Sequence, residues 1–128
     1  MRFIPTIVHG LLDYVYVILL LFVPYIFGFS SNNADAYVMD IAASAVLIYS
    51  IHTKYELGLF KNIPMRTHLT IDLIIGVLLA ASPWLLGFAN EVYGPHLFFG
   101  LFAVVASLCS KPTSSTIEKS TYAENRIT

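Results

Sequence analysis

The chain has 128 residues, of which 57% are hydrophobic and 12% are charged. A soluble domain carries charge on about a quarter of its residues, so this composition, with a mean hydropathy of +0.73, excludes an ordinary water-soluble protein. The net charge of −1 and the lack of a basic cluster exclude nucleic acid as a partner, and the single cysteine excludes a disulfide framework and a cysteine zinc site.

Four apolar stretches are long enough to cross a bilayer, which takes about 17–25 residues per helix. We expect the membrane-spanning helices at about 5–28, 35–53, 66–87 and 95–111. All seven Lys and Arg residues lie before the first stretch, between the second stretch and the first residue of the third, or from the last residue of the fourth onward. By the positive-inside rule, both termini of this multi-pass protein then lie in the cytoplasm. The lipid bilayer is therefore its first predicted partner.

The stretch at about 5–28 recurs 59 residues later in the chain. In both copies an aromatic residue follows a proline near the end of the helix, and a glycine comes a few residues later. The proline kinks the last turn, the glycine takes the left-handed conformation that ends a helix, and the ring anchors that end at the outer headgroup level. The residues of this helix-end motif are Pro24, Tyr25 and Gly28 in the first copy and Ser82, Pro83, Trp84 and Gly87 in the second.

Each copy continues into a second apolar stretch, so the repeating unit is a helical hairpin that begins and ends on one side of the membrane. Repeat 1 spans about 4–53, repeat 2 spans about 63–110, and an interfacial linker, 54–62, joins them. Such parallel repeats are related by a pseudo-twofold axis along the membrane normal. We therefore predict one all-α transmembrane domain, 1–110, that forms a four-helix bundle. A cytoplasmic tail, 111–128, follows it and is predicted to be disordered because it is rich in Ser, Thr, Lys and Glu.

The segment Ser82-Pro83-Trp84, at the end of the first helix of a two-helix unit, resembles the SPW-repeat family of small bacterial membrane proteins. The resemblance covers roughly residues 4–110. The first copy is degenerate, because it reads Val23-Pro24-Tyr25 at the same place. The resemblance implies an integral protein of the bacterial cytoplasmic membrane, and it implies no particular activity.

Two ionisable pairs interrupt the apolar first helix of the two hairpins, His9 with Asp13 and His68 with Asp72. The i, i+4 spacing places both side chains of a pair on one face of the helix, about 6 Å apart along its axis. A carboxylate in the middle of a spanning helix costs about 2.5–3.5 kcal/mol unless it is paired or hydrated. The pseudo-twofold axis can bring the two pairs together, so the sequence predicts a cluster of two histidines and two aspartates inside the membrane.

Three hypotheses explain such a cluster. In the first, it is a buried hydrogen-bond network that fixes the packing of the two hairpins and needs no ligand. In the second, it relays protons or holds a divalent cation such as zinc, because His and Asp are usual residues of proton pathways and of metal sites. In the third, His9 and His68 ligate a haem iron, although the adjacent carboxylates fit poorly beside an iron ligand.

The sequence has no glycine-rich phosphate loop and no nucleophile next to a base, so we expect neither enzymatic activity nor a cofactor. The preferred function is that of a structural or accessory component of a membrane complex or of a homo-oligomer. The alternative is a protein that handles protons or divalent cations, and any metal would then be held by His9, Asp13, His68 and Asp72. The other titratable groups of the spans, Asp40, His52 and His96, fall at or near helix ends and need no functional explanation.

Overall fold

The structure is a computed structural model that describes residues 1–29 and 32–127. Within this part of the chain the regular secondary structure is helical, as the apolar stretches predict. The helices are α1 (Thr6–Ile26), α2 (Ala34–Ile51), α3 (Met65–Leu85), α4 (Gly94–Cys109) and α5 (Ser115–Ile127). The first four begin and end within a few residues of the predicted spans.

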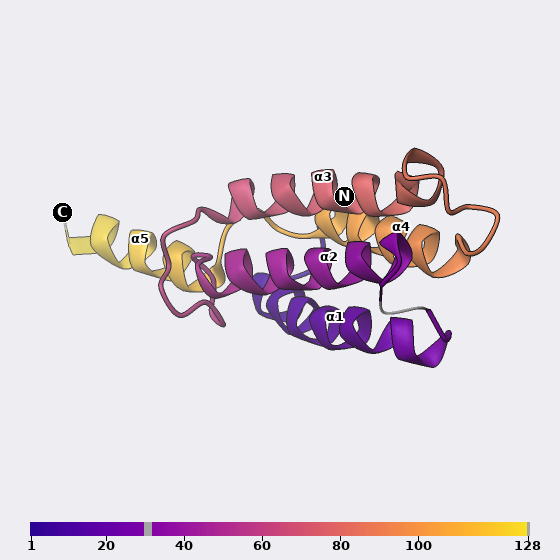
Figure 1. Ribbon diagram of the computed structural model, residues 1–128. Coiled ribbons are helices and arrows are strands. Elements are labelled where there is room, and N and C mark those ends of the chain that lie inside the picture. The colour runs from indigo at the N-terminus through magenta and orange to yellow at the C-terminus, as the bar shows by residue number, and fades with distance from the viewer. Residues whose placement is uncertain (30–31, 128) are drawn as a thin grey trace.

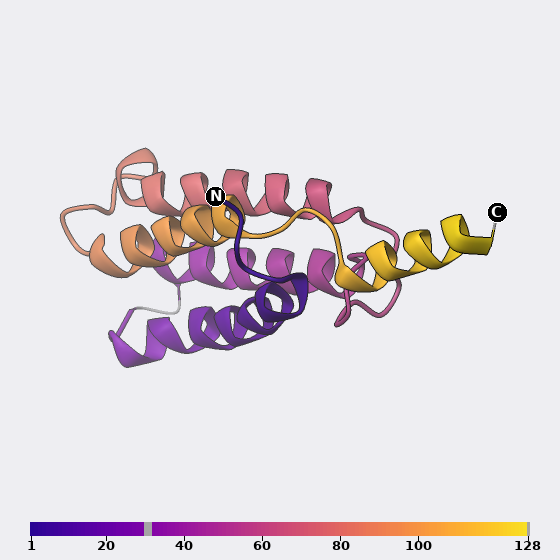
Figure 2. The same ribbon diagram turned by 180° about the vertical axis from the view of Figure 1, so that it is seen from behind.

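Helices α1 to α4 lie side by side and alternate in direction, so they form a bundle as predicted (Figures 1 and 2). Helix α1 packs mainly against α2, and α3 mainly against α4, so each hairpin is a packing unit. Residues 1–5, 52–64 and 110–114 form one end of the bundle, which we call the connection end. The loops that follow α1 and α3 form the opposite end.

The backbone at the connection end repeats with the pseudo-twofold symmetry of the sequence. The N–H of Ile4 donates to the carbonyl of Cys109 (3.0 Å), and the N–H of Ile63 donates to the carbonyl of His52 (2.8 Å). In both places the start of one hairpin pairs with the end of the second helix of the other hairpin. The two hairpins are thus joined reciprocally, as parallel repeats about a twofold axis require.

The helix-end motif ends α1 and α3 by the same means. Pro24 and Pro83 lie inside the last turns of the two helices. Gly28 and Gly87 have φ angles of 69° and 78°, a left-handed conformation that glycine adopts without steric cost. The prediction that these glycines take the left-handed conformation is confirmed.

Helices α3 and α4 cross at backbone contact. A Cβ added to Gly100 would lie 2.4 Å from the backbone nitrogen of Ala80 and 2.6 Å from the carbonyl oxygen of Gly76. Small residues at such a crossing let two membrane helices approach closely, which increases their van der Waals contact. The second hairpin therefore depends on small residues at its centre.

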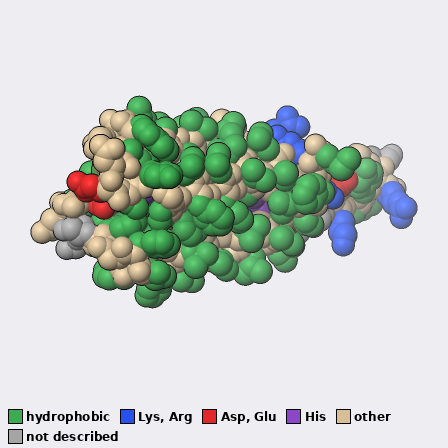
Figure 3. All heavy atoms as spheres, turned by 90° about the vertical axis from the view of Figure 1, so that its right-hand side faces the viewer, with side chains coloured by type: hydrophobic (Ala, Val, Ile, Leu, Met, Phe, Trp, Pro, Cys, Tyr) green, Lys and Arg blue, Asp and Glu red, His purple; other side chains and the backbone are tan. Residues whose placement is uncertain are grey.

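The surface of the bundle is largely apolar. Figure 3 shows hydrophobic side chains over most of one face, with Lys and Arg side chains gathered towards one end. Helices α1, α2 and α3 are long and apolar enough to cross a membrane, whereas α4 is apolar but has only 16 residues. At 1.5 Å per residue α4 is about 24 Å long, shorter than the ~30 Å hydrocarbon core, so the bilayer thins or the flanking residues extend the span.

The tail that the sequence predicts to be disordered instead contains helix α5, which projects from the connection end (Figure 1). A composition rich in Ser, Thr, Lys and Glu predicts disorder, but such a segment also forms a helix where backbone hydrogen bonds form in its first turn and its charged residues suit the helix dipole. The N–H of Glu118 donates to the carbonyl of Ser114 (3.1 Å). Glu118 lies in the first turn and Arg126 in the last, where an acid and a base respectively stabilise the helix dipole.

The linker 54–62 lies only partly on the surface. Leu59 and Phe60 are exposed, as an interfacial segment would have them, but Tyr55 is only 1% exposed. Its ring occupies the space beside Gly10 on α1, where an added Cβ would lie 2.4 Å from the Tyr55 Cε2 atom. The linker therefore carries a tyrosine into the bundle, which its composition does not predict.

Candidate metal centre

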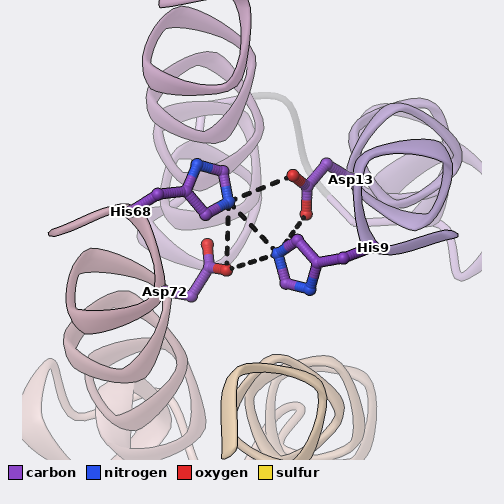
Figure 4. Close-up of side chains that lie close together, drawn as sticks. All are labelled: His9, Asp13, His68 and Asp72. Carbon is purple, nitrogen blue, oxygen red and sulfur yellow. Dashed lines mark hydrogen bonds and ion pairs between the residues drawn. The ribbon is translucent and has the colours of Figure 1, made fainter. Parts of the chain in front are cut away.

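His9 and Asp13 on α1 point towards His68 and Asp72 on α3 (Figure 4). All four side chains are buried, with exposed fractions from 0% for His68 to 7% for Asp13. They come from corresponding positions of the two hairpins, so the cluster lies where the pseudo-twofold symmetry brings the first helices together. The structure places the four residues that the sequence singles out in one contiguous group.

The four side chains are within hydrogen-bonding distance of one another. His9 Nε2 lies 3.1 Å from His68 Nε2, 3.0 Å from Asp72 Oδ2 and 3.3 Å from Asp13 Oδ1. His68 Nε2 lies 3.1 Å from Asp13 Oδ2 and 3.3 Å from Asp72 Oδ2. Each histidine therefore contacts the aspartate of its own helix and the aspartate of the other helix.

The outward nitrogen of each imidazole bonds to a hydroxyl group. His9 Nδ1 lies 2.7 Å from Ser110 Oγ, and His68 Nδ1 lies 2.7 Å from Thr53 Oγ1. The hydroxyl of Ser110 donates to the carbonyl of Ala106, and that of Thr53 donates to the carbonyl of Tyr49. Because each hydroxyl proton is used in this way, the hydroxyl oxygen accepts from Nδ1–H. A neutral imidazole then presents the lone pair of Nε2 to the cluster, whereas a protonated imidazole donates its Nε2–H to the carboxylates.

The carboxylates are held by further donors that sequence reasoning did not identify. The hydroxyl of Tyr49 donates to Asp72 Oδ1, while Ser50 Oγ and the Tyr55 hydroxyl each donate to Asp13 Oδ2 over 3.2 Å. Burial, and then the negative charge of Asp13, raise the pKa of the Tyr55 hydroxyl well above its usual range, so it remains a proton donor. These bonds fix the carboxylates with oxygen atoms facing the histidines.

The surroundings of the cluster differ on its two sides. Towards the connection end, the hydroxyls of Thr6 and Ser114 donate to the carboxylate of Glu56 over 2.7 and 3.0 Å. Towards the opposite end, fully buried apolar side chains such as Leu20 and Met39 fill the bundle. A cavity of about 20 Å³ beside the cluster has room for one water molecule. Polar groups therefore approach the cluster from the connection end.

The helix-end motif lies away from the cluster, at the opposite end. Ser82 and Pro83 are buried, whereas Trp84 is 56% exposed and Tyr25 is also exposed. The ring centroids of Trp84 and Tyr93 are 5.8 Å apart. Tyr93 is the last residue of the loop between α3 and α4. The inward residues thus pack within the bundle, and the aromatic residues face outwards.

The other aspartate and the other histidines that the sequence analysis names in the spans lie outside the cluster. Asp40 is exposed on α2, and His52 bonds through Nδ1 to the carbonyl of Ile48 (2.7 Å). His96, in contrast, is fully buried, with Nε2 2.9 Å from the carbonyl of Asp35 and with its Nδ1 lacking a partner among the described residues. Its position in the first turn of α4 did not indicate this burial, because the packing partners come from α2 and from the loops at the opposite end.

The four side chains lie close enough together to hold one metal ion. With zinc bonds to His nitrogen and carboxylate oxygen of about 2.0–2.2 Å, neighbouring ligand atoms of a tetrahedron lie about 3.3–3.6 Å apart. The separations of 3.0–3.3 Å between the side chains are those of hydrogen bonds, so a bound ion requires the side chains to move slightly apart. One ligand atom from each of the four residues lies within 4.8 Å of all the others. The same 3.1 Å between the two Nε2 atoms leaves no room for a porphyrin between the histidines, so the haem hypothesis is wrong for this arrangement.

A comparison with protein families decides where the chain belongs. The family model of the SPW repeat domain matches residues 7–110. The chain belongs to the SPW repeat family. The SPW match covers both hairpins and all four cluster residues, in agreement with the resemblance of Ser82-Pro83-Trp84.

The SPW repeat assignment, together with three helices long and apolar enough to span a bilayer, makes this chain a small membrane protein. No curated protein and no solved structure matches it. Evidence on what the SPW repeat does here therefore comes from the chain's own geometry.

Proposed function

We propose that this protein is a non-enzymatic component of the bacterial cytoplasmic membrane in which one divalent cation, of the zinc type, joins the two hairpins. His9, Asp13, His68 and Asp72 are the proposed ligands. The observation that carries the proposal is the 3.1 Å separation of two imidazole Nε2 atoms whose Nδ1 atoms both bond to hydroxyl groups. Two such lone pairs repel one another unless a proton or a cation lies between them.

The charge of the cluster supports a divalent ion. Two ionised carboxylates, Asp13 and Asp72, carry a charge of −2 into a buried site, and such a charge needs compensation. In the described part of the chain, the only basic side chains in ion-pair contact with these carboxylates are His9 and His68. With neutral imidazoles, one divalent cation makes the cluster neutral.

The hydroxyl groups behind the histidines also suit a metal. Histidine ligands usually donate their second ring N–H to an acceptor, which fixes the tautomer and the orientation of the ring. Thr53 and Ser110 supply that acceptor for His68 and His9. The ligating nitrogens are thereby oriented towards a cation.

The number of protein ligands favours a structural role. Four protein ligands complete a tetrahedral zinc site, whereas catalytic sites keep one position open for water or substrate. The apolar filling towards the opposite end, with Leu20 and Met39, also supports cation binding over conduction across the bundle. On this basis we propose a structural or accessory role, in association with a second copy or with another membrane protein.

Metal analysis of the protein purified in mild detergent without chelators tests the proposal. We expect about one zinc-type ion per chain, a lower melting temperature after removal of the ion, and recovery when Zn²⁺ is added back. Co²⁺ in place of the native ion should give the visible absorption of a tetrahedral site. Protein that contains no such ion, and whose melting temperature does not respond to Zn²⁺, would contradict the proposal and favour the hydrogen-bond network.

Variants assign the ion to this cluster. Asp13→Asn and Asp72→Asn keep a side chain of the same shape but remove a ligand charge, so each should lose the ion. Asp40→Asn is the matched control, because it removes an exposed aspartate of α2 outside the cluster. Equal metal content in Asp13→Asn and wild type would place the ion elsewhere. If an Asn variant does not fold, the Co²⁺ spectrum of the wild-type chain still decides the ligand geometry.

A further inference from the structure

A groove at the connection end lies between the start of α3 and the end of α4. Its volume is about 400 Å³, and polar and apolar residues line it together. Arg2, Arg66 and Thr70 supply polar groups, while Leu69, Leu73 and Leu108 supply apolar walls. This groove is separate from the His/Asp cluster and shares none of its four residues.

The charge of the groove is positive. Its lining contains two arginines and no acidic residue. Arg2 donates from Nη1 to the carbonyl of Ser110 (2.9 Å), which holds its guanidinium at the groove. In the described part of the chain, neither Arg2 nor Arg66 has a carboxylate within ion-pair distance. The guanidinium groups therefore have donors available for an anion from outside the protein.

The apolar walls restrict the kind of anion. Arg66 is the second residue of α3, so it lies at the end of the span, whereas Leu73 lies two turns further along the helix. Leu108, in the last turn of α4, is exposed on the facing side. A ligand with a phosphate at the end of the span and a hydrocarbon chain directed along the helices fits both features. A free phosphate uses only the arginines.

The polar groups that α3 contributes to the groove have no counterpart on α1. At the corresponding positions of the first hairpin, Ile7 stands for Arg66 and Leu11 stands for Thr70. Both are exposed and apolar, so that face of α1 carries no group for a phosphate. The two faces thus differ in the charge that a specific lipid contact needs.

We propose that the groove of Arg2 and Arg66 binds the headgroup of an anionic phospholipid, with an acyl chain along Leu73 and Leu108. Guanidinium groups bind phosphate through paired charge-assisted hydrogen bonds, and basic pockets between membrane helices bind anionic headgroups. The inference is independent of the proposed metal centre, because its residues and its ligand are different.

The test measures binding of phosphatidylglycerol to the full chain in detergent, by native mass spectrometry and by the rise in melting temperature. Phosphatidylcholine and inorganic phosphate are the comparison ligands. We expect phosphatidylglycerol to bind wild type at least tenfold more tightly than either comparison ligand, because only it carries both a net negative charge and an acyl chain. Equal binding of phosphatidylcholine, or of inorganic phosphate, would overturn the proposal.

Arg66→Gln should weaken phosphatidylglycerol binding about tenfold, the effect of losing one charge-assisted contact. Arg126→Gln is the matched control, because it removes an arginine from α5, outside the groove. Equal loss in both variants would show that binding follows the overall charge and would contradict the site. Metal content measured on the same samples separates the two proposals, since Arg66→Gln leaves all four cluster residues in place.

Discussion

At the scale of single residues, the hydrogen bond at Nδ1 of His9 and of His68 determines whether Nε2 can act as a ligand. Nδ1 faces away from the cluster, and Nε2 faces into it. Thr53 and Ser110 accept a hydrogen bond from Nδ1, so in a neutral imidazole Nε2 carries the lone pair. These hydroxyl residues follow the second helix of the opposite hairpin. Each histidine is therefore oriented by the hairpin to which it does not belong, and the chemistry of the cluster depends on correct docking of the two repeats.

Thr53→Val tests this dependence, because valine has nearly the same shape as threonine and cannot accept the Nδ1 hydrogen bond. We expect Zn²⁺ affinity to fall about 10–100-fold, as it does when the supporting partner of a metal-bound histidine is removed. Competition with a chelating dye at fixed pH measures the change.

Thr70→Val is the control for the loss of a threonine hydroxyl in a helix. Thr70 donates to the carbonyl of Arg66 four residues earlier, as Thr53 does to that of Tyr49, but it is exposed and does not contact the cluster. The Thr70→Val variant should bind Zn²⁺ with the affinity of wild type. Unchanged affinity in Thr53→Val would mean that the hydroxyl does not orient a ligand.

The members of the cluster differ in how well the sequence reveals them. A His/Asp pair inside an apolar run is conspicuous, and its recurrence in the second copy indicates that the pairs meet. Tyr49, Ser50 and Tyr55 give no such signal, since hydroxyl residues are common near helix ends. Their contact with Asp13 and Asp72 depends on how α2 and the linker pack against the first helices.

At the scale of helices, the local signals for starting and ending a span were sufficient to predict α1 to α4. Each span has a long apolar run, and α1 and α3 also have a proline and a glycine at their ends, features that act within a few residues. Helix α5 lacks an apolar run, so hydropathy did not predict it. The burial of Tyr55 and His96 was also missed, because it arises from contacts between segments distant in the chain.

Gly100→Ala tests the close crossing of α3 and α4. The added Cβ would lie 2.4 Å from the Ala80 backbone nitrogen, so the two helices must separate. Overpacking of this kind costs about 1–3 kcal/mol of unfolding free energy. Thermal or denaturant unfolding in detergent measures the loss.

Gly94→Ala provides the matched control, because Gly94 begins the same helix and an added Cβ there meets no atom within 4 Å. Its stability should equal that of wild type or exceed it slightly, since alanine favours the helix. A loss as large in Gly94→Ala as in Gly100→Ala would show that glycine itself, and not the crossing, matters to α4.

At the scale of the whole molecule, the two hairpins place residues 1–5, 52–64 and 110–114 at one end of the bundle. The basic residues Arg2, Lys54, Lys61, Arg66 and Lys111 belong to this end or border it, and Lys119 and Arg126 lie on the helix that projects from it. The loops at the opposite end contain no Lys or Arg. The structure thus agrees with the sequence in placing all the basic residues on one side, whereas the direction of that side relative to the cell remains a prediction.

Reporter fusions test this prediction. By the positive-inside rule, a reporter at the C-terminus or inserted at Asn62 should lie in the cytoplasm, and one inserted at Asn33 or Asn90 should lie in the periplasm. Paired alkaline phosphatase and fluorescent protein fusions measure this, because the phosphatase is active only outside the cytoplasm and the fluorescent protein only inside it. The insertion at Asn90 serves as a control for the one at Asn62, since both lie in loops between helices. A periplasmic C-terminus would contradict the orientation.

The expected orientation also determines the side from which a cation enters. The polar side of the cluster, near Thr6 and Glu56, then faces the cytoplasm. A cation would therefore reach His9 and His68 from the cytoplasm.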